Sequence, residues 1–173
     1  MQNLITSLKR EYFPIGLILI LALSRLIPHP DNFTPIIAIA IMGSYFFNNI
    51  NLSYLVVLFS MLIADFFIGF YGHVLFVYLP LFLIILVFFK LSKKINFKNL
   101  FIFGFAGSLL FFIISNFGVW LVSGLYQKNI SGLIECYFMA IPFFKNTLIS
   151  TLIFSYFTLI IYKFSSKFFI LKA

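Results

Sequence analysis

The chain has 173 residues, of which 63% are hydrophobic and 9% are charged, and its net charge is +8. Soluble chains carry about 25% charged residues, so this composition excludes a soluble globular domain and predicts an all-α, polytopic membrane protein. The basic residues alternate with long apolar runs, which is typical of topology signals and not of a nucleic-acid-binding patch.

We predict six apolar helices in chain order, over residues 13–27, 35–47, 52–71, 73–89, 100–122 and 147–162. The second is short, because a helix needs about 20 residues to cross a hydrocarbon core of about 30 Å. Before the last helix, residues 128–146 are apolar but contain Glu135 and Pro142, and we expect an interfacial or re-entrant segment there. Residues 1–173 are expected to form a single transmembrane domain, a compact bundle.

The distribution of basic residues predicts the orientation of this bundle. With six spans, one side collects nine basic residues: Lys9, Arg10, Lys90, Lys93, Lys94, Lys98, Lys163, Lys167 and Lys172. The other side holds three, which are Arg25, Lys128 and Lys145. Because cytoplasmic loops carry the excess of Lys and Arg, we expect both termini in the cytoplasm of a multi-pass inner-membrane protein.

Two charged residues, Arg25 and Asp65, occur within the predicted spans, at similar depth. At 1.5 Å per residue, Asp65 lies roughly 20 Å along its helix and Arg25 roughly 18 Å along its own. A buried arginine without a partner is strongly disfavoured, so we predict an ion pair between the two side chains. Two interpretations stay open: a purely structural clamp, or a pair that lines a pocket and holds a polar ligand.

Further polar side chains gather at the same level of the bundle. The first outer loop has three prolines that limit its backbone freedom, and Asn116 and Trp120 lie one turn apart on one helical face. We expect an outward-facing ligand site over an apolar floor, made by Arg25, His29, Asn32, Asp65, Asn116, Trp120, Tyr137 and Asn146. The alternative is that the loop residues are solvated and that Trp120 is an interfacial anchor.

Motifs for catalysis and for metal binding are missing from the sequence. It contains no Walker-type phosphate loop, no His-Glu-x-x-His and no Gly-x-Ser-x-Gly. The single cysteine, Cys136, gives neither a disulfide framework nor a cysteine-rich metal site. We therefore predict no catalytic residues, no cofactor and no metal site, and we expect that the protein is not an enzyme.

Four stretches carry a resemblance to a known family: residues 25–35, Ala64-Asp-Phe-Phe-Ile-Gly69, Ser115-Asn-Phe-Gly-Val-Trp120 and residues 136–147. They resemble an uncharacterised family of small bacterial membrane proteins over essentially the whole chain. With its six short helices and an Ala-Asp followed by Gly, that family is similar to the substrate-capture S components of energy-coupling factor (ECF) transporters.

The resemblance to S components implies a function and a set of partners. Such a protein captures a vitamin-like or other small molecule from the outer side of the membrane. It depends on a separate membrane coupling subunit and two ATPases, and it has no nucleic-acid partner. Another class stays open, since a small six-helix protein similar to the rod-shape protein of the cell-wall machinery acts as a scaffold.

Overall fold

The protein is a bundle of α-helices in the computed structural model, which describes residues 2–91 and 95–170. In these ranges the helices are α1 (Gln2–Leu23), α2 (Ile36–Phe46), α3 (Ile50–Ile68), α4 (Val74–Leu91), α5 (Phe97–Val122) and α6 (Ile130–Ile170). A short 3₁₀ helix, η1 (Ser24–Leu26), extends α1, and no strand occurs among the described residues. The all-α prediction is confirmed.

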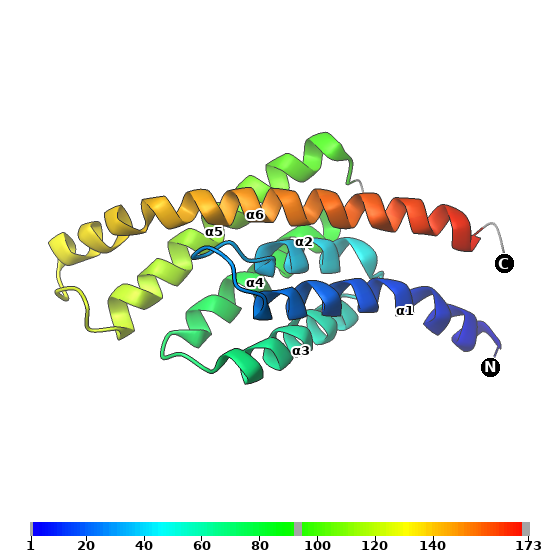
Figure 1. The fold of residues 1–173 in the computed structure, drawn as a ribbon, viewed down its shortest axis with the longest axis horizontal. Coiled ribbons are helices and arrows are strands. Elements are labelled where there is room, and N and C mark those ends of the chain that lie inside the picture. Colours follow the sequence, from blue (N-terminus) through cyan, green and yellow to red (C-terminus); the bar gives the residue numbers. More distant parts are fainter. Residues whose placement is uncertain (1, 92–94, 171–173) are drawn as a thin grey trace.

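The short helix α2 forms the centre of the bundle (Figure 1). It contacts α1, α3, α4, α5 and α6, and all of its residues except Tyr45 are buried. Its 11 residues are about 16 Å long, which is too short to cross a hydrocarbon core of about 30 Å. A helix that is apolar on every face is expected to be enclosed by its neighbours, and α2 is enclosed in this way.

The outer surface of the bundle is strongly apolar. Leu75, Phe66 and Ile130 are more than 70% exposed, and many other large hydrophobic side chains are also exposed. Four helices, α3 to α6, are long and apolar enough to cross a membrane. An apolar surface of this extent is stable in lipid and not in water.

Helix α6 is continuous over 41 residues, from Ile130 to Ile170. The last helix therefore begins well before the predicted residue 147, and residues 130–146 are its first part. That these residues lie at the membrane interface stays a prediction. Pro142 lies inside the helix at an exposed position, and proline is tolerated within membrane helices. At 1.5 Å per residue α6 is about 62 Å long, longer than a bilayer core.

Successive helices run in opposite directions along the bundle (Figure 1). Three connections lie at one end, which we call the loop end: residues 27–35, 69–73 and 123–129. The start of α1 and the end of α6 lie together at the opposite end. This arrangement fits the expectation that both termini face the same side of a membrane; the identity of that side stays a prediction.

Candidate functional site

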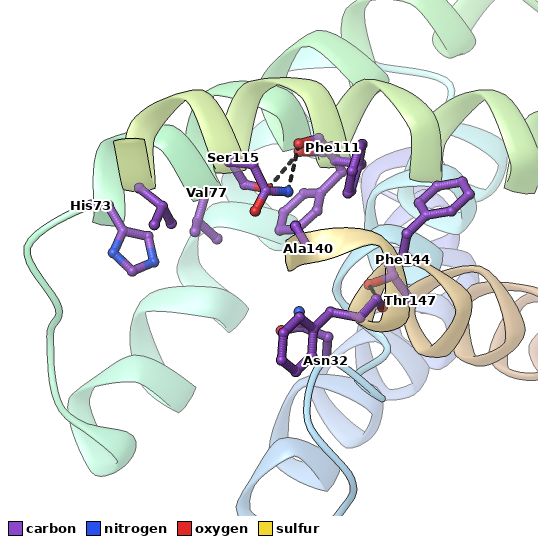
Figure 2. Close-up of a pocket in the computed structure, with 12 residues that line it drawn as sticks. Asn32, His73, Val77, Phe111, Ser115, Ala140, Phe144 and Thr147 are labelled. Atoms are coloured by element: carbon purple, nitrogen blue, oxygen red, sulfur yellow. Dashed lines mark hydrogen bonds between the residues drawn. The ribbon is translucent and has the colours of Figure 1, made fainter. Parts of the chain in front are cut away.

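A partly enclosed pocket of about 130 Å³ lies at the loop end, between α4, α5 and α6 (Figure 2). The loop before α2 closes it from one side. The residues that line it are Asn32, His73, Val77, Phe111, Phe112, Ser115, Asn116, Val119, Ala140, Phe143, Phe144 and Thr147. Amide, hydroxyl and imidazole groups thus meet four phenylalanine side chains in a single cavity.

The pocket walls follow helical spacing on two helices. On α5, residues 112, 115, 116 and 119 recur at i, i+3, i+4 and i+7, and on α6 residues 140, 143, 144 and 147 do the same. Residues with this spacing share one face of a helix. The two faces meet across the cavity, where the rings of Phe112 and Phe144 lie 5.1 Å apart at 60°.

Asn32 reaches the pocket from a loop with an unusual backbone. Its φ of 58° is in the left-handed region, which asparagine tolerates better than most residues. The backbone N–H of Phe33 donates to the carbonyl of Pro30 at 3.0 Å and closes the turn around it. This geometry directs the Asn32 side chain toward α6 (Figure 2).

Two side chains of α6 fasten the same loop. Asn146 Nδ2 donates to the carbonyl of Asp31 at 3.0 Å, and Ser150 Oγ lies 3.0 Å from the carbonyl of Thr34. Both bonds join residues more than 100 positions apart in the chain. The loop is therefore held over the pocket by α6, although Asn146 itself does not line the cavity.

Each polar side chain of α5 and α6 in the pocket donates one hydrogen bond within its own helix. Ser115 Oγ, Asn116 Nδ2 and Thr147 Oγ1 donate to the carbonyl four residues earlier, at 2.7, 2.8 and 3.0 Å. Figure 2 shows two of these bonds as dashed lines. The side-chain oxygens consequently keep their lone pairs for another partner.

The pocket lining contains no Asp, Glu, Lys or Arg. Its titratable side chain, His73, comes from the loop before α4 and packs against Tyr71 with ring centroids 4.9 Å apart. Burial lowers the pKa of His73 below its ordinary value of 6.5. The imidazole is therefore neutral at pH 7, and the cavity carries no formal charge.

Arg25 and Asp65 form an ion pair outside this pocket. Arg25 Nη1 lies 2.8 Å from Asp65 Oδ1, and the two side chains are 8% and 0% exposed. Tyr78 Oη donates to Asp65 Oδ2 at 2.7 Å, and Arg25 also contacts the sulfur of Met61. The pair thus links η1, α3 and α4, and it compensates the cost of burying either charge alone.

Trp120 lies near the end of α5 and is not among the residues that line the cavity. Its Nε1 donates to the carbonyl of Gln127 at 2.9 Å. The ammonium group of Lys128 lies 5.5 Å from the centre of the Trp120 ring and donates to the Trp120 carbonyl. These contacts fold the loop 123–129 back onto the helix, an arrangement typical of an aromatic anchor.

The remaining predicted residues also lie outside the cavity lining. Tyr137 Oη donates to the carbonyl of Ile113 at 2.6 Å and so joins α6 to α5. His29 is exposed, with Nδ1 3.0 Å from the carbonyl of Pro30. Of the eight predicted residues, Asn32 and Asn116 line the pocket.

Sequence reasoning missed Ser115, Thr147 and the phenylalanines as wall residues. The available signal was the spacing 140, 143, 144 and 147, which marks one helical face. The prediction placed residues 140, 143 and 144 in one segment and residue 147 in the next. For this reason the four residues were not recognised as one helical face.

An all-helical bundle with an apolar exterior and a small pocket at one end is a protein of membrane type. The chain belongs to a family of unknown function, DUF6580, whose model matches residues 6–170. This confirms the resemblance to an uncharacterised family. Neither a curated protein nor a solved structure matches the chain, so the similarity to ECF S components stays a prediction. Within the described residues, no group of three or more His, Cys, Asp or Glu is arranged to hold a metal ion.

Proposed function

We propose that this protein captures a small molecule in the pocket at its loop end, as the substrate-capture subunit of a bacterial inner-membrane transport system. The observation that carries the proposal is the pocket itself, where polar groups from two loops and from helices α5 and α6 converge on an aromatic cavity. Such cavities, lined by apolar walls with a few placed polar groups, are the usual form of small-molecule sites.

The loop 27–35 supports a capture mechanism. It contributes Asn32 to the pocket and is fastened to α6 by side-chain bonds from Asn146 and Ser150. A ligand that reaches the cavity from the loop end passes this segment. In the proposal the loop end faces outward, because it is the side with few basic residues.

The source of energy lies outside the chain in this proposal. The sequence has no phosphate-binding loop with which to hydrolyse ATP. As in the ECF S components that it resembles, the protein therefore transfers its ligand with the help of a separate coupling subunit and ATPases. It performs no chemistry on the ligand.

Native mass spectrometry of the tagged protein, gently extracted from its own membranes, tests this function. We expect a retained small molecule that is lost in the Asn116→Leu variant, together with coupling and ATPase subunits. The matched control is Asn51→Leu, an exposed position on α3 outside the pocket. A protein that carries no ligand and co-purifies with cell-wall enzymes contradicts the proposal.

A second candidate function is a non-enzymatic scaffold of a cell-envelope complex, similar to the rod-shape protein. The observation that favours it is that Arg25 and Asp65 pair with each other away from the cavity. Two of the predicted ligand-binding residues then serve the architecture alone. The same native spectra distinguish the two functions, because a scaffold retains protein partners and no small molecule.

A further inference from the structure

The size of the pocket limits the ligand. Its volume is about 130 Å³, whereas sites for drug-sized molecules measure about 300–1,000 Å³. A protein cavity of about 150 Å³ accommodates one benzene molecule. The cavity therefore has room for no more than a single ring, and because it is only partly enclosed, a small substituent would extend into its opening.

The shape and composition of the walls favour a flat ring. Phe112 from α5 and Phe144 from α6 meet edge to face in the lining, with centroids 5.1 Å apart. Phe111 and Phe143 add further apolar surface on the same two helices. Aromatic side chains pack favourably against a planar ring in stacked and edge-to-face arrangements.

The electrostatics of the pocket favour a neutral ligand. The lining holds no charged side chain. Arg25 and Asp65 pair with each other and do not line the cavity. Transfer of an unpaired charge from water into an apolar cavity is strongly unfavourable, so an ionic ligand has nothing here to balance it.

The polar side chains of the helices offer hydrogen-bond acceptors to a ligand, and the Asn116 amide keeps a second N–H as well. Asn116 Nδ2 donates to a carbonyl of its own helix at 2.8 Å, which fixes the amide orientation and leaves Oδ1 without a partner among the described residues. The hydroxyl groups of Ser115 and Thr147 likewise donate to backbone carbonyls of their own helices. A partner that fills these acceptors has to bring its own N–H or O–H groups.

From these four features, and resting on the proposed capture function, we infer the chemical class of the ligand. It is a neutral, single-ring molecule that carries at least one N–H or O–H donor. The donor bonds to Asn116 Oδ1 and to the neighbouring hydroxyl oxygens, and the ring lies among the phenylalanines of α5 and α6.

Three probes of nearly equal shape test this inference one feature at a time. Benzamide is neutral and has N–H donors, acetophenone replaces the NH₂ group by a methyl group, and benzoate replaces it by a charged oxygen. Their binding is measured by isothermal titration to the full-length protein in lipid nanodiscs. We expect benzamide to bind about fivefold more tightly than acetophenone, since a lost hydrogen bond costs about 1 kcal/mol. Benzoate is also expected to bind more weakly, because its charge has no partner in the cavity.

Variants connect this preference to the pocket. Asn116→Leu is expected to remove the preference for benzamide over acetophenone. Ser115→Ala is expected to weaken benzamide binding about threefold, whereas Ser60→Ala leaves it unchanged. Ser60 is the matched control, because its hydroxyl makes the same bond to the carbonyl four residues earlier, on α3 outside the cavity.

The outcomes separate this inference from the proposed function. Equal binding of the three probes, or a preference for benzoate, overturns the inferred ligand class while ligand capture stands. If none of the probes binds, the inferred class is wrong, and native mass spectrometry then decides on capture. A co-purifying molecule of another class keeps the capture function, and its absence removes both.

Discussion

At the scale of single residues, the ion pair of Arg25 and Asp65 places two opposite charges inside the bundle. Both charges are almost entirely removed from solvent, and Tyr78 supplies a further hydrogen bond to the carboxylate. When one partner is removed, the other charge stays buried without compensation, which costs about 3–5 kcal/mol.

A double-mutant cycle measures this coupling. We expect Arg25→Ala and Asp65→Ala each to lower the free energy of unfolding by about 3–5 kcal/mol. The double variant is expected to lose clearly less than the sum, because it leaves no unpaired charge. Thermal unfolding in detergent provides the readout, and additive losses would contradict a coupled pair.

His73 predicts a pH dependence of stability. Burial lowers its pKa below the ordinary value of 6.5, so in the folded protein it binds a proton less readily than in the unfolded chain. Stability is therefore complete above about pH 6.5 and falls as the pH drops from there toward the folded pKa. We expect His73→Gln to reduce this acid sensitivity of the melting temperature.

The control for that measurement is His29→Gln. His29 is exposed at the loop end and does not line the pocket. We expect this variant to keep the pH profile of the unmodified protein. If both variants have the same profile, groups other than His73 cause the acid sensitivity.

At the scale of elements, the contact between α4 and α5 depends on a glycine. A Cβ atom added at Gly118 would overlap the side chain of Phe76 close to the α4 backbone. Small residues at such crossings allow helices in membranes to approach closely. The position of α5, and with it the Asn116 face of the pocket, rests on this close approach.

Gly118→Ala is expected to destabilise the protein by about 1–3 kcal/mol, because the backbones have to move apart. Gly16→Ala is the matched control, since a Cβ at that position of α1 meets nothing within 4 Å. In a helix interior that control is expected to stabilise by about 0.5–1 kcal/mol. Equal unfolding temperatures of the two variants would exclude the proposed overlap.

At the scale of the whole molecule, orientation in the membrane is open to a direct experiment. Cys136 is buried and is the only cysteine in the sequence, so a Cys136→Ser background permits single labels. Gln127→Cys places a thiol at the loop end, and Asn48→Cys places one at the opposite end, both at exposed positions. We expect an impermeant maleimide to label intact cells at residue 127, and at residue 48 only after permeabilisation. The reverse pattern would place the termini outside.

Residue types and their order predicted much of the fold. Apolar runs predicted helices near all six observed positions, and the weak second run corresponds to the buried helix α2. The estimated distance of Arg25 and Asp65 along their helices placed both residues at one level of the bundle. In the structure they form an ion pair. The predicted start of the last helix was too late, because Glu135 and Pro142 indicated an interruption within residues 128–146. In α6 both side chains lie on exposed positions, and the helix continues.

What the sequence by itself determined is the class of the protein, since hydropathy and helical periodicity are local properties of a chain in lipid. The tertiary structure decided which polar residues share a cavity. Asn32 and Thr147 are more than 100 positions apart, yet both line the pocket, whereas Trp120, one turn from Asn116, does not. The physical reason is that contacts with the other helices determine which side of each helix faces the cavity. The close approach of Gly118 to Phe76 is one such contact. The spacing of residues along a single helix does not contain that information.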